Sequence, residues 1–188
     1  MIINSGNIIG KTVNLRTAEP KDAEYTLSIR MSGHKTQYLN SFTGSLESQK
    51  RWIQEKIDSE DACFCIAELK DGTPIGTYGF EELNQTTRSA DTGHALLLGN
   101  MIQNSEAVFL LYQYMFNVLN LKVVTTDILE QNNASIGITK RFGGIKTSEC
   151  YSDLHKMKLL HFEITSEAFA EKEKVFNDLL ERFGDRIS

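Results

Sequence analysis

Residues 90–121 read ADTGHALLLGNMIQNSEAVFLLYQYMFNVLNL, and this stretch decides the fold class. Its first part, Ala90 to Leu98, has the composition of a strand and ends in three leucines. The residues Gly99-Asn100-Met101-Ile102-Gln103-Asn104-Ser105 follow, and then a helix in which apolar residues recur in steps of 3, 4 and 3, at Val108, Leu111, Met115 and Val118. A strand followed by an amphipathic helix predicts a helix packed on a sheet.

Two strands precede this stretch and are joined by a tight turn. Cys63 to Leu69 and Pro74 to Leu83 are rich in apolar residues, and Asp71-Gly72 between them is a strong hairpin signal. Together with the strand that ends at Leu98, they predict an antiparallel meander. Cys63 and Cys65 share one face of the first strand, where we interpret them as core thiols because no matching metal ligand lies near.

The remaining segments surround this meander in a mixed order. The full pattern predicts β-α-α-β-β-β-α-β-α-β-β and a further helix from Ser166. Strands in pairs, mixed with helices, favour the α+β class over a doubly wound parallel sheet. We therefore expect a mixed, mostly antiparallel central sheet that is flanked by helices.

The length of 188 residues and the apolar fraction of 40% predict one globular domain over residues 1–188. Its core is expected at about 12–165. Residues 166–188 are expected to form a docked C-terminal helix, because they carry an apolar stripe of Phe169, Phe176, Leu180 and Phe183.

The charge and cysteine content exclude several classes of function. With 20 Lys and Arg against 25 Asp and Glu, the net charge of −5 makes a general grip on nucleic acid unfavourable. No apolar run approaches the roughly 18 residues of a membrane span, and no signal-peptide pattern is present. The three cysteines contain no CxxC pair. We expect a cytoplasmic protein without nucleic-acid, membrane or metal partners, and a homodimer remains open.

The order of these segments and the residues at their joints resemble the GNAT superfamily of acetyl-CoA-dependent N-acetyltransferases. The resemblance covers Val13 to Thr165. It is carried by Val13-Asn14-Leu15-Arg16 with Asp22-Ala23, Asp71-Gly72-Thr73-Pro74-Ile75-Gly76, Ser105-Glu106-Ala107 and Asn132-Asn133-Ala134-Ser135-Ile136, ending at Arg141-Phe142-Gly143-Gly144. It implies an acyl-CoA N-acyltransferase-like fold, acetyl-CoA as co-substrate and acetyl transfer to a primary amine.

The resemblance also implies a diphosphate site before the long helix. Where the family has an Arg/Gln-x-x-Gly-x-Gly/Ala loop, this chain reads Gly99-Asn100-Met101-Ile102-Gln103-Asn104. Helix-start amides hold an anion without glycines, so we expect the donors to be Gln103, Asn104, Ser105 and Glu106. The alternative is the N-cap of a packed helix with no ligand.

The family's two central strands separate, and the pantetheine arm pairs with the main chain of one of them. The resemblance places that main chain at Leu96, Leu97 and Leu98. Asn132, with Ser135 one turn later, is then expected to bind the arm. The alternative for Asn132 is a plain helix N-cap.

Acetyl transfer requires a deprotonated amine and a protonated leaving thiolate. His94 is the histidine of the predicted meander, and Glu81 and Glu82 end the preceding strand, where only one of them can face the site. We expect His94 and Glu81 to act in catalysis. The alternatives are a structural histidine and surface carboxylates. Thr139 occupies the position where the family often has a tyrosine acid. The general acid is therefore left open, with water as one candidate.

Arg30 and Tyr38, in the early helices and their loop, are the candidate substrate residues, with solvated surface charge as the alternative. This part resembles bacterial enzymes that acetylate nucleotide-linked amino sugars, and also the alanine acetyltransferases of ribosomal proteins. We expect a small-molecule amine as acceptor, and a nucleotide-linked amino sugar first. The alternatives are a protein N-terminal amine and a non-catalytic CoA-binding module of the same fold.

Overall fold

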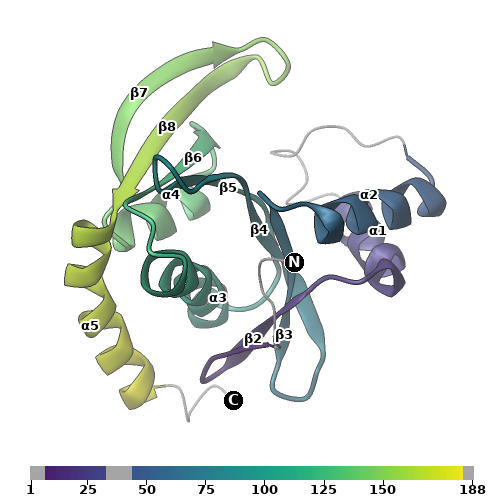
Figure 1. Ribbon diagram of the computed structural model, residues 1–188, viewed down its shortest axis with the longest axis horizontal. Helices are drawn as coiled ribbons and strands as arrows, with labels where there is room; N and C mark the ends of the chain where they lie inside the picture. Colours follow the sequence, from purple (N-terminus) through teal and green to yellow (C-terminus); the bar gives the residue numbers. More distant parts are fainter. Residues whose placement is uncertain (1–6, 33–43, 184–188) are drawn as a thin grey trace.

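The computed structural model describes residues 7–32 and 44–183. Within them, eight strands form one sheet in the order β1-β2-β3-β4-β5-β6-β8-β7 (Figure 1). The strands are β1 Ile8–Ile9, β2 Val13–Thr17, β3 Cys63–Leu69, β4 Pro74–Asn84, β5 Ser89–Leu97, β6 Val123–Leu129, β7 Ile145–Ser152 and β8 Met157–Thr165. All neighbours are antiparallel except β5 and β6. The predicted mixed, mostly antiparallel sheet is confirmed, and β1 is an addition to it.

The helices follow the predicted order. They are α1 Ala23–Met31, α2 Leu46–Asp58, α3 Met101–Gln113, α4 Asn133–Arg141 and α5 Ser166–Phe183. A 3-10 turn at Pro20–Asp22 precedes α1, and a π-helical turn at Tyr114–Val118 continues α3. No helix in residues 7–32 and 44–183 is long and apolar enough to cross a membrane.

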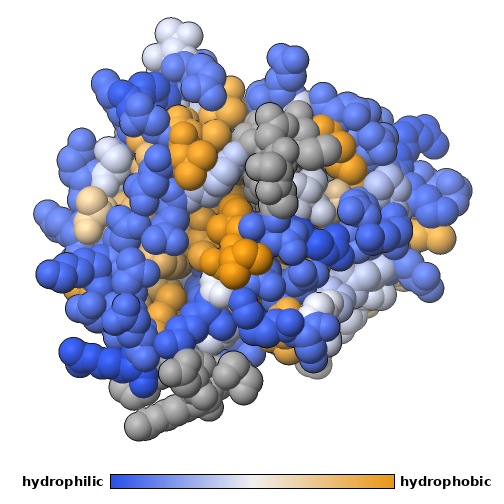
Figure 2. Space-filling model, turned by 60° about the horizontal axis from the view of Figure 1, so that its bottom comes forward, coloured by the Kyte–Doolittle hydropathy of each residue, from blue (hydrophilic) through white to orange (hydrophobic). Residues whose placement is uncertain are grey.

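Alternation along β3 divides the core into two layers. Phe64 and Ile66 point to one face and pack with residues of α1 and α2, where the Trp52 ring lies 4.8 Å from the Phe64 ring. Cys63 and Cys65 point to the other face and join the core formed with α3, and their sulfur atoms lie 3.4 Å apart. The core interpretation of both thiols is therefore confirmed. Figure 2 shows one outer face, where hydrophilic side chains flank a central strip of hydrophobic ones.

The second layer is built around α3. Residues 105–112 of this helix are all buried. Phe109 stacks on Phe142 from α4 and contacts Phe169 and Phe176 from α5. The predicted apolar stripe does not extend to Val118, which is 66% exposed. The cause is the π-helical turn, because its wider hydrogen-bond spacing rotates the later residues away from the core face.

Glu106 is buried within α3 and binds the turn between β1 and β2. Its carboxylate accepts the main-chain N–H groups of Lys11 and Thr12 and the hydroxyl of Thr12. The side chain has no exposed surface. Glu106 therefore links the β1–β2 turn, at the edge of the sheet, to α3.

Replacing Glu106 with alanine leaves these donors of the β1–β2 turn without their acceptor. The free energy of unfolding is expected to fall by about 2–4 kcal/mol, because buried donors that lose a charged partner pay their full desolvation cost. Urea denaturation measures this change. Glu47→Ala is the control, since Glu47 is exposed and its ion pair in the described part of the chain is with Lys50 of the same helix. A Glu106→Ala protein as stable as Glu47→Ala would contradict the assignment.

Candidate functional site

The strands β5 and β6 pair over a short distance and then separate. Residues 89–91 of β5 pair with residues 123–125 of β6, and no pair follows them. Two threonines mark the point of separation: Thr92 Oγ1 donates to the Thr125 carbonyl at 3.1 Å, and Thr126 Oγ1 donates to the Thr92 carbonyl at 3.1 Å. The separation of the central strands, which the family resemblance implied, is confirmed.

A bulge in β5 lies just beyond this point. Gly93 pairs with Gly79 and Leu96 pairs with Thr77, so β5 has one more residue than β4 between the two pairs. Inside the bulge, His94 has a φ of 57°, in the left-handed region. Bulges bend a strand and increase its twist, which accounts for the divergence of β5 from β6.

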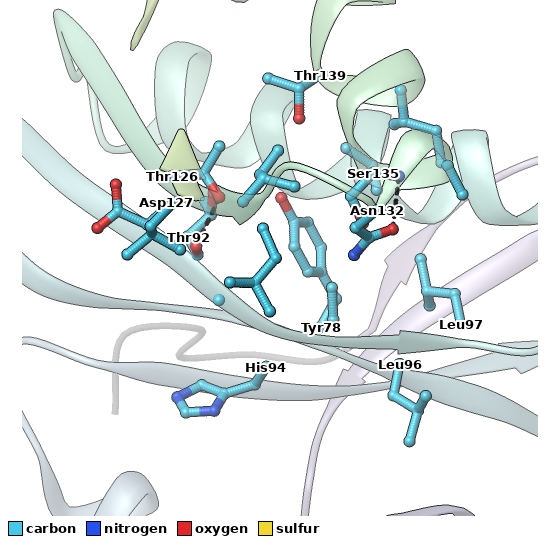
Figure 3. Close-up of a pocket in the computed structure, with 18 of the residues that line it drawn as sticks. Tyr78, Thr92, His94, Leu96, Leu97, Thr126, Asp127, Asn132, Ser135 and Thr139 are labelled. Carbon is cyan, nitrogen blue, oxygen red and sulfur yellow. Dashed lines mark hydrogen bonds between the residues drawn. The ribbon is translucent and has the colours of Figure 1, made fainter. Parts of the chain in front are cut away.

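A cavity of about 510 Å³ fills the space between the separated strands. Its walls are residues 92–97 of β5, residues 126–129 of β6, the first turns of α4 and the β7–β8 hairpin (Figure 3). Because β4 pairs with the other edge of β5, no strand within residues 7–32 and 44–183 pairs with the edge of residues 92–97 that faces the cavity. Such an edge binds an extended ligand through main-chain hydrogen bonds.

Two asparagines place amide groups at this cavity. Asn132 Oδ1 caps α4 by accepting the Ser135 N–H at 3.2 Å, while its amide nitrogen points into the cavity (Figure 3). Asn104 donates to the Gly99 carbonyl at 2.8 Å, and its Oδ1 is buried without a partner in the described part of the chain. One donor and one acceptor are complementary to the amide groups of a pantetheine arm.

The side chains of Leu96 and Leu97 take opposite directions. Figure 3 shows Leu97 on the side of Asn132 and Leu96 on the opposite side of the strand. Both residues line the cavity. Leu98 lies beyond the end of β5, is 43% exposed and donates its N–H to the Ile75 carbonyl at 2.7 Å. The Leu98 N–H is thus bonded to β4, and Leu98 does not line the cavity.

The expected start of α3 was wrong. The helix begins at Met101, and Asn100 caps it by accepting the N–H groups of Ile102 and Gln103 at 2.9 and 3.0 Å. Gln103 Oε1 in turn accepts the Asn100 N–H at 2.9 Å, which completes a capping box. The Asn104 N–H is already bonded to the Asn100 carbonyl. The first-turn amides are therefore those of residues 101–103, so only Gln103 of the four predicted donors belongs to the first turn.

Ser105 and Glu106 consequently lie inside the helix and away from the cavity. Both are fully buried. Ser105 Oγ donates to the Met101 carbonyl at 2.7 Å and accepts from Arg141 Nη1 at 2.6 Å. This contact brings the Arg141 guanidinium from the end of α4 to the first turn of α3, a turn that has no basic residue of its own.

His94 and Glu81 come together on the opposite face of the sheet. The His94 ring lies 5.2 Å from the Trp52 ring and 5.8 Å from the Phe64 ring, on the side covered by α1 and α2. His94 Nε2 is 2.6 Å from Glu81 Oε1. Lys56 from α2 binds the same carboxylate oxygen. The two predicted catalytic residues therefore form one charged cluster with Lys56.

The surroundings of this cluster set its protonation. Burial lowers the pKa of His94, and the nearby charges of Lys56 and Arg30 add to this effect against the opposing influence of Glu81. Burial raises the pKa of Glu81, but hydrogen bonds from Lys56 and His94 outweigh it and hold that pKa below its usual value. An ionised carboxylate only accepts, so Nε2 of a neutral His94 carries the proton and Nδ1 is the basic nitrogen.

The remaining predicted residues divide between the two faces. Arg30 is half-buried on α1, and Tyr38 lies outside the described residues. Glu82 occupies a second irregularity of β4, with a φ of 55°, and is exposed. The predictions missed Lys56 and several hydroxyl groups of the cavity, those of Tyr78, Thr92, Tyr112 and Thr126. The sequence shows no local signal for them, because they come from different strands and helices.

Comparisons with known proteins agree with this architecture. A family model described as the acetyltransferase (GNAT) domain matches residues 12–145. The comparison with curated proteins gave no match.

Several solved structures are similar. Apo FdhC, described as a nucleotide-linked sugar GNAT, is 20% identical with a TM-score of 0.79, over 92% of this chain and 97% of that one. Spermidine N-acetyltransferase from Vibrio cholerae, in complex with CoA and spermine, is 13% identical with a TM-score of 0.77, over 86% of this chain and 99% of that one. A GCN5-related N-acetyltransferase from Brucella melitensis is 14% identical with a TM-score of 0.77, over 92% and 84%. At these identities, the likeness concerns the fold.

The two roles of Asn132 are separable by substitution. Asn132→Ser keeps an oxygen that caps α4 but loses the amide nitrogen that points into the cavity. Titration calorimetry with CoA is expected to show about 5- to 10-fold weaker binding, equivalent to one hydrogen bond, with the thermal midpoint unchanged. Asn133→Ser, in the exposed neighbour, is the control. Equal CoA affinity of the two variants would show that Asn132 is only a cap.

Proposed function

The chain belongs to the GNAT acetyltransferase family, and from this premise we propose that it transfers the acetyl group of acetyl-CoA to a primary amine of a small molecule by direct attack on the thioester. The observation that carries the proposal is the cavity between β5 and β6, which opens where the two strands stop pairing after Asp91 and Thr125. The two faces of the sheet separate the donor from the acceptor. The thioester arm enters from the side of α3 and α4, and the amine enters from the side of α1 and α2.

The arm of acetyl-CoA is placed along the free edge of β5. The main chain at residues 96 and 97 supplies hydrogen bonds, and Asn104 Oδ1 and the Asn132 amide nitrogen supply an acceptor and a donor. Ser135 lines the same wall of the cavity. The acetyl group then reaches the bulge at His94, the point where the cavity meets the acceptor face.

The diphosphate is placed at the first turn of α3. There it replaces the side-chain cap of Asn100 on the amides of Ile102 and Gln103. Arg141 supplies the positive charge that the loop lacks, since its guanidinium already contacts Ser105 of this helix. The same donors therefore cap α3 in the free protein and bind phosphate in the complex.

Removing the charge of Arg141 tests this placement. Arg141→Gln is expected to weaken acetyl-CoA binding about tenfold, because a charged hydrogen bond to phosphate is lost. Binding of acetyl-pantetheine, which has no diphosphate, is expected to stay unchanged. Titration calorimetry with both ligands measures the difference, and Lys140→Gln, in the exposed neighbour, is the control. Equal losses for both ligands would place Arg141 away from the diphosphate.

The acceptor amine is activated by His94. A neutral imidazole held by an ionised carboxylate is suited to take the proton that the amine loses on attack, and Glu81 orients it. Arg30 and Lys56 lie on the same side and lower the pKa of His94 by their charge. We infer a nucleotide-linked amino sugar as the acceptor, and the similarity to FdhC supports this class.

Thiol release from acetyl-CoA with a panel of amines tests the function. The panel contains a nucleotide-linked amino sugar, spermine and a peptide with a free N-terminus. The proposal expects the amino sugar to react fastest. A faster reaction of the peptide would favour the protein N-terminal amine as acceptor. CoA binding without turnover on any amine would identify a non-catalytic module.

Variants of the charged cluster are expected to move the pH profile in opposite directions. His94→Ala lowers kcat by about 10²- to 10⁴-fold, the usual contribution of a general base. Lys56→Met removes a positive charge beside His94, so the pKa of His94 rises and the acid limb of kcat moves to higher pH. Glu81→Gln removes a negative charge, so the limb moves to lower pH. The measurement is kcat against pH at saturating acceptor. An acid limb at the same pH in the wild type, Lys56→Met and Glu81→Gln would remove His94 as the base.

A further inference from the structure

Four hydroxyl groups line the cavity, and the proposed function uses none of them. They come from Tyr78 on β4, Thr92 on β5, Tyr112 on α3 and Thr139 on α4. Each of these residues is at most 5% exposed. The Tyr78 hydroxyl interacts with those of Thr92 and Tyr112, and the Tyr112 hydroxyl interacts with those of Thr92 and Thr139. The four groups therefore form one buried network.

Tyr78 is the member of this network that stands at the seam between the strands. It lies on β4 opposite the β5 bulge, between the pair of Thr77 with Leu96 and the pair of Gly79 with Gly93. Figure 3 shows its ring between Thr92 and Asn132, with the hydroxyl directed to the side on which Thr139 lies. In the proposed complex, the ring of Tyr78 therefore lies beside the end of the thioester arm.

Tyr112 is directed to the core instead. Its ring makes edge contacts with Phe142 at 5.9 Å and Phe169 at 6.0 Å, and a tilted contact with Phe116 at 6.3 Å. Thr139 stands at the α4 position where the family often has a tyrosine acid, and its aliphatic hydroxyl is a much weaker acid than a phenol. Tyr78 is thus the phenol that is best placed to reach the sulfur of the arm.

We propose that the hydroxyl of Tyr78 protonates the sulfur of CoA as the thioester breaks, an inference that rests on the proposed function. The amine nitrogen forms a bond to the acetyl carbon, the C–S bond breaks, and its electron pair goes to sulfur. The Tyr78 O–H proton passes to that sulfur, and the phenolate takes a proton back from water. The surplus proton of the amine leaves through His94. The products are the acetamide and the CoA thiol.

The hydroxyl of Tyr78 carries its proton at neutral pH, because burial raises its pKa well above the usual value. The neighbouring Thr92 hydroxyl acts in the opposite direction and lowers the pKa of Tyr78. Tyr78 thus serves the acid function from β4 that the family often serves from α4.

Tyr78→Phe removes the hydroxyl and keeps the ring. We expect kcat for acetyl-CoA and the best amine of the panel to fall about 100-fold or more, the usual contribution of a general acid, with the Kd for CoA within about threefold of wild type. Tyr112→Phe is the matched control, because it removes one hydroxyl from the same network but not the one at the seam. It is expected to lose less than about tenfold in kcat. Equal losses in both variants, or a kcat of Tyr78→Phe within about tenfold of wild type, would overturn the assignment.

A second readout does not require turnover. The pKa of the bound CoA thiol, followed by the ultraviolet absorbance of its thiolate, is expected to be higher in Tyr78→Phe than in wild type, because the thiolate loses a hydrogen-bond donor. An unchanged thiol pKa would overturn the inference even if activity fell. Failure of the proposed function has a different signature: the wild-type protein then binds CoA but acetylates no amine, and the thiol pKa still reports on Tyr78.

Discussion

The separation of β5 from β6 is the constraint on which the whole site depends. Three residue pairs hold these strands together, and the hydroxyls of Thr92 and Thr126 bond across them at the apex, the point where the strands separate. Beyond the apex, the bulge at His94 bends β5 away. The same bulge therefore opens the cavity and turns the His94 side chain toward the other face of the sheet. In the proposed function, this one local irregularity provides both the donor site and the acceptor site.

The two layers of the core support opposite halves of the proposed reaction. The layer of α3, α4 and α5 holds the cavity, with asparagines and hydroxyl groups directed at it. The layer of α1 and α2 holds the cluster of His94, Glu81 and Lys56. The proposed donor site on one face and the proposed base on the other meet across a single strand. Because strand residues alternate between faces, β5 can serve both halves with neighbouring residues.

The order of elements was predictable because each depends on local signals, such as the Asp71-Gly72 turn. His94 and Glu81 were predictable as candidates because both lie on strands of one meander, but their contact with each other was not predicted. The predicted start of α3 was wrong because the apolar stripe begins later than the helix, which starts at the capping pair of Asn100 and Gln103. The hydroxyl network and the burial of Glu106 beneath the β1–β2 turn depend on contacts between residues far apart in the chain, and no pattern of spacing shows them.

A crystal structure of the protein with CoA bound tests the central claim most directly. The account predicts that the pantetheine arm lies between β5 and β6, bonded to the main chain near residues 96 and 97, with its sulfur beside the bulge. A complex in which CoA lies elsewhere, or in which residues 92–97 pair with β6 and close the seam, would contradict it.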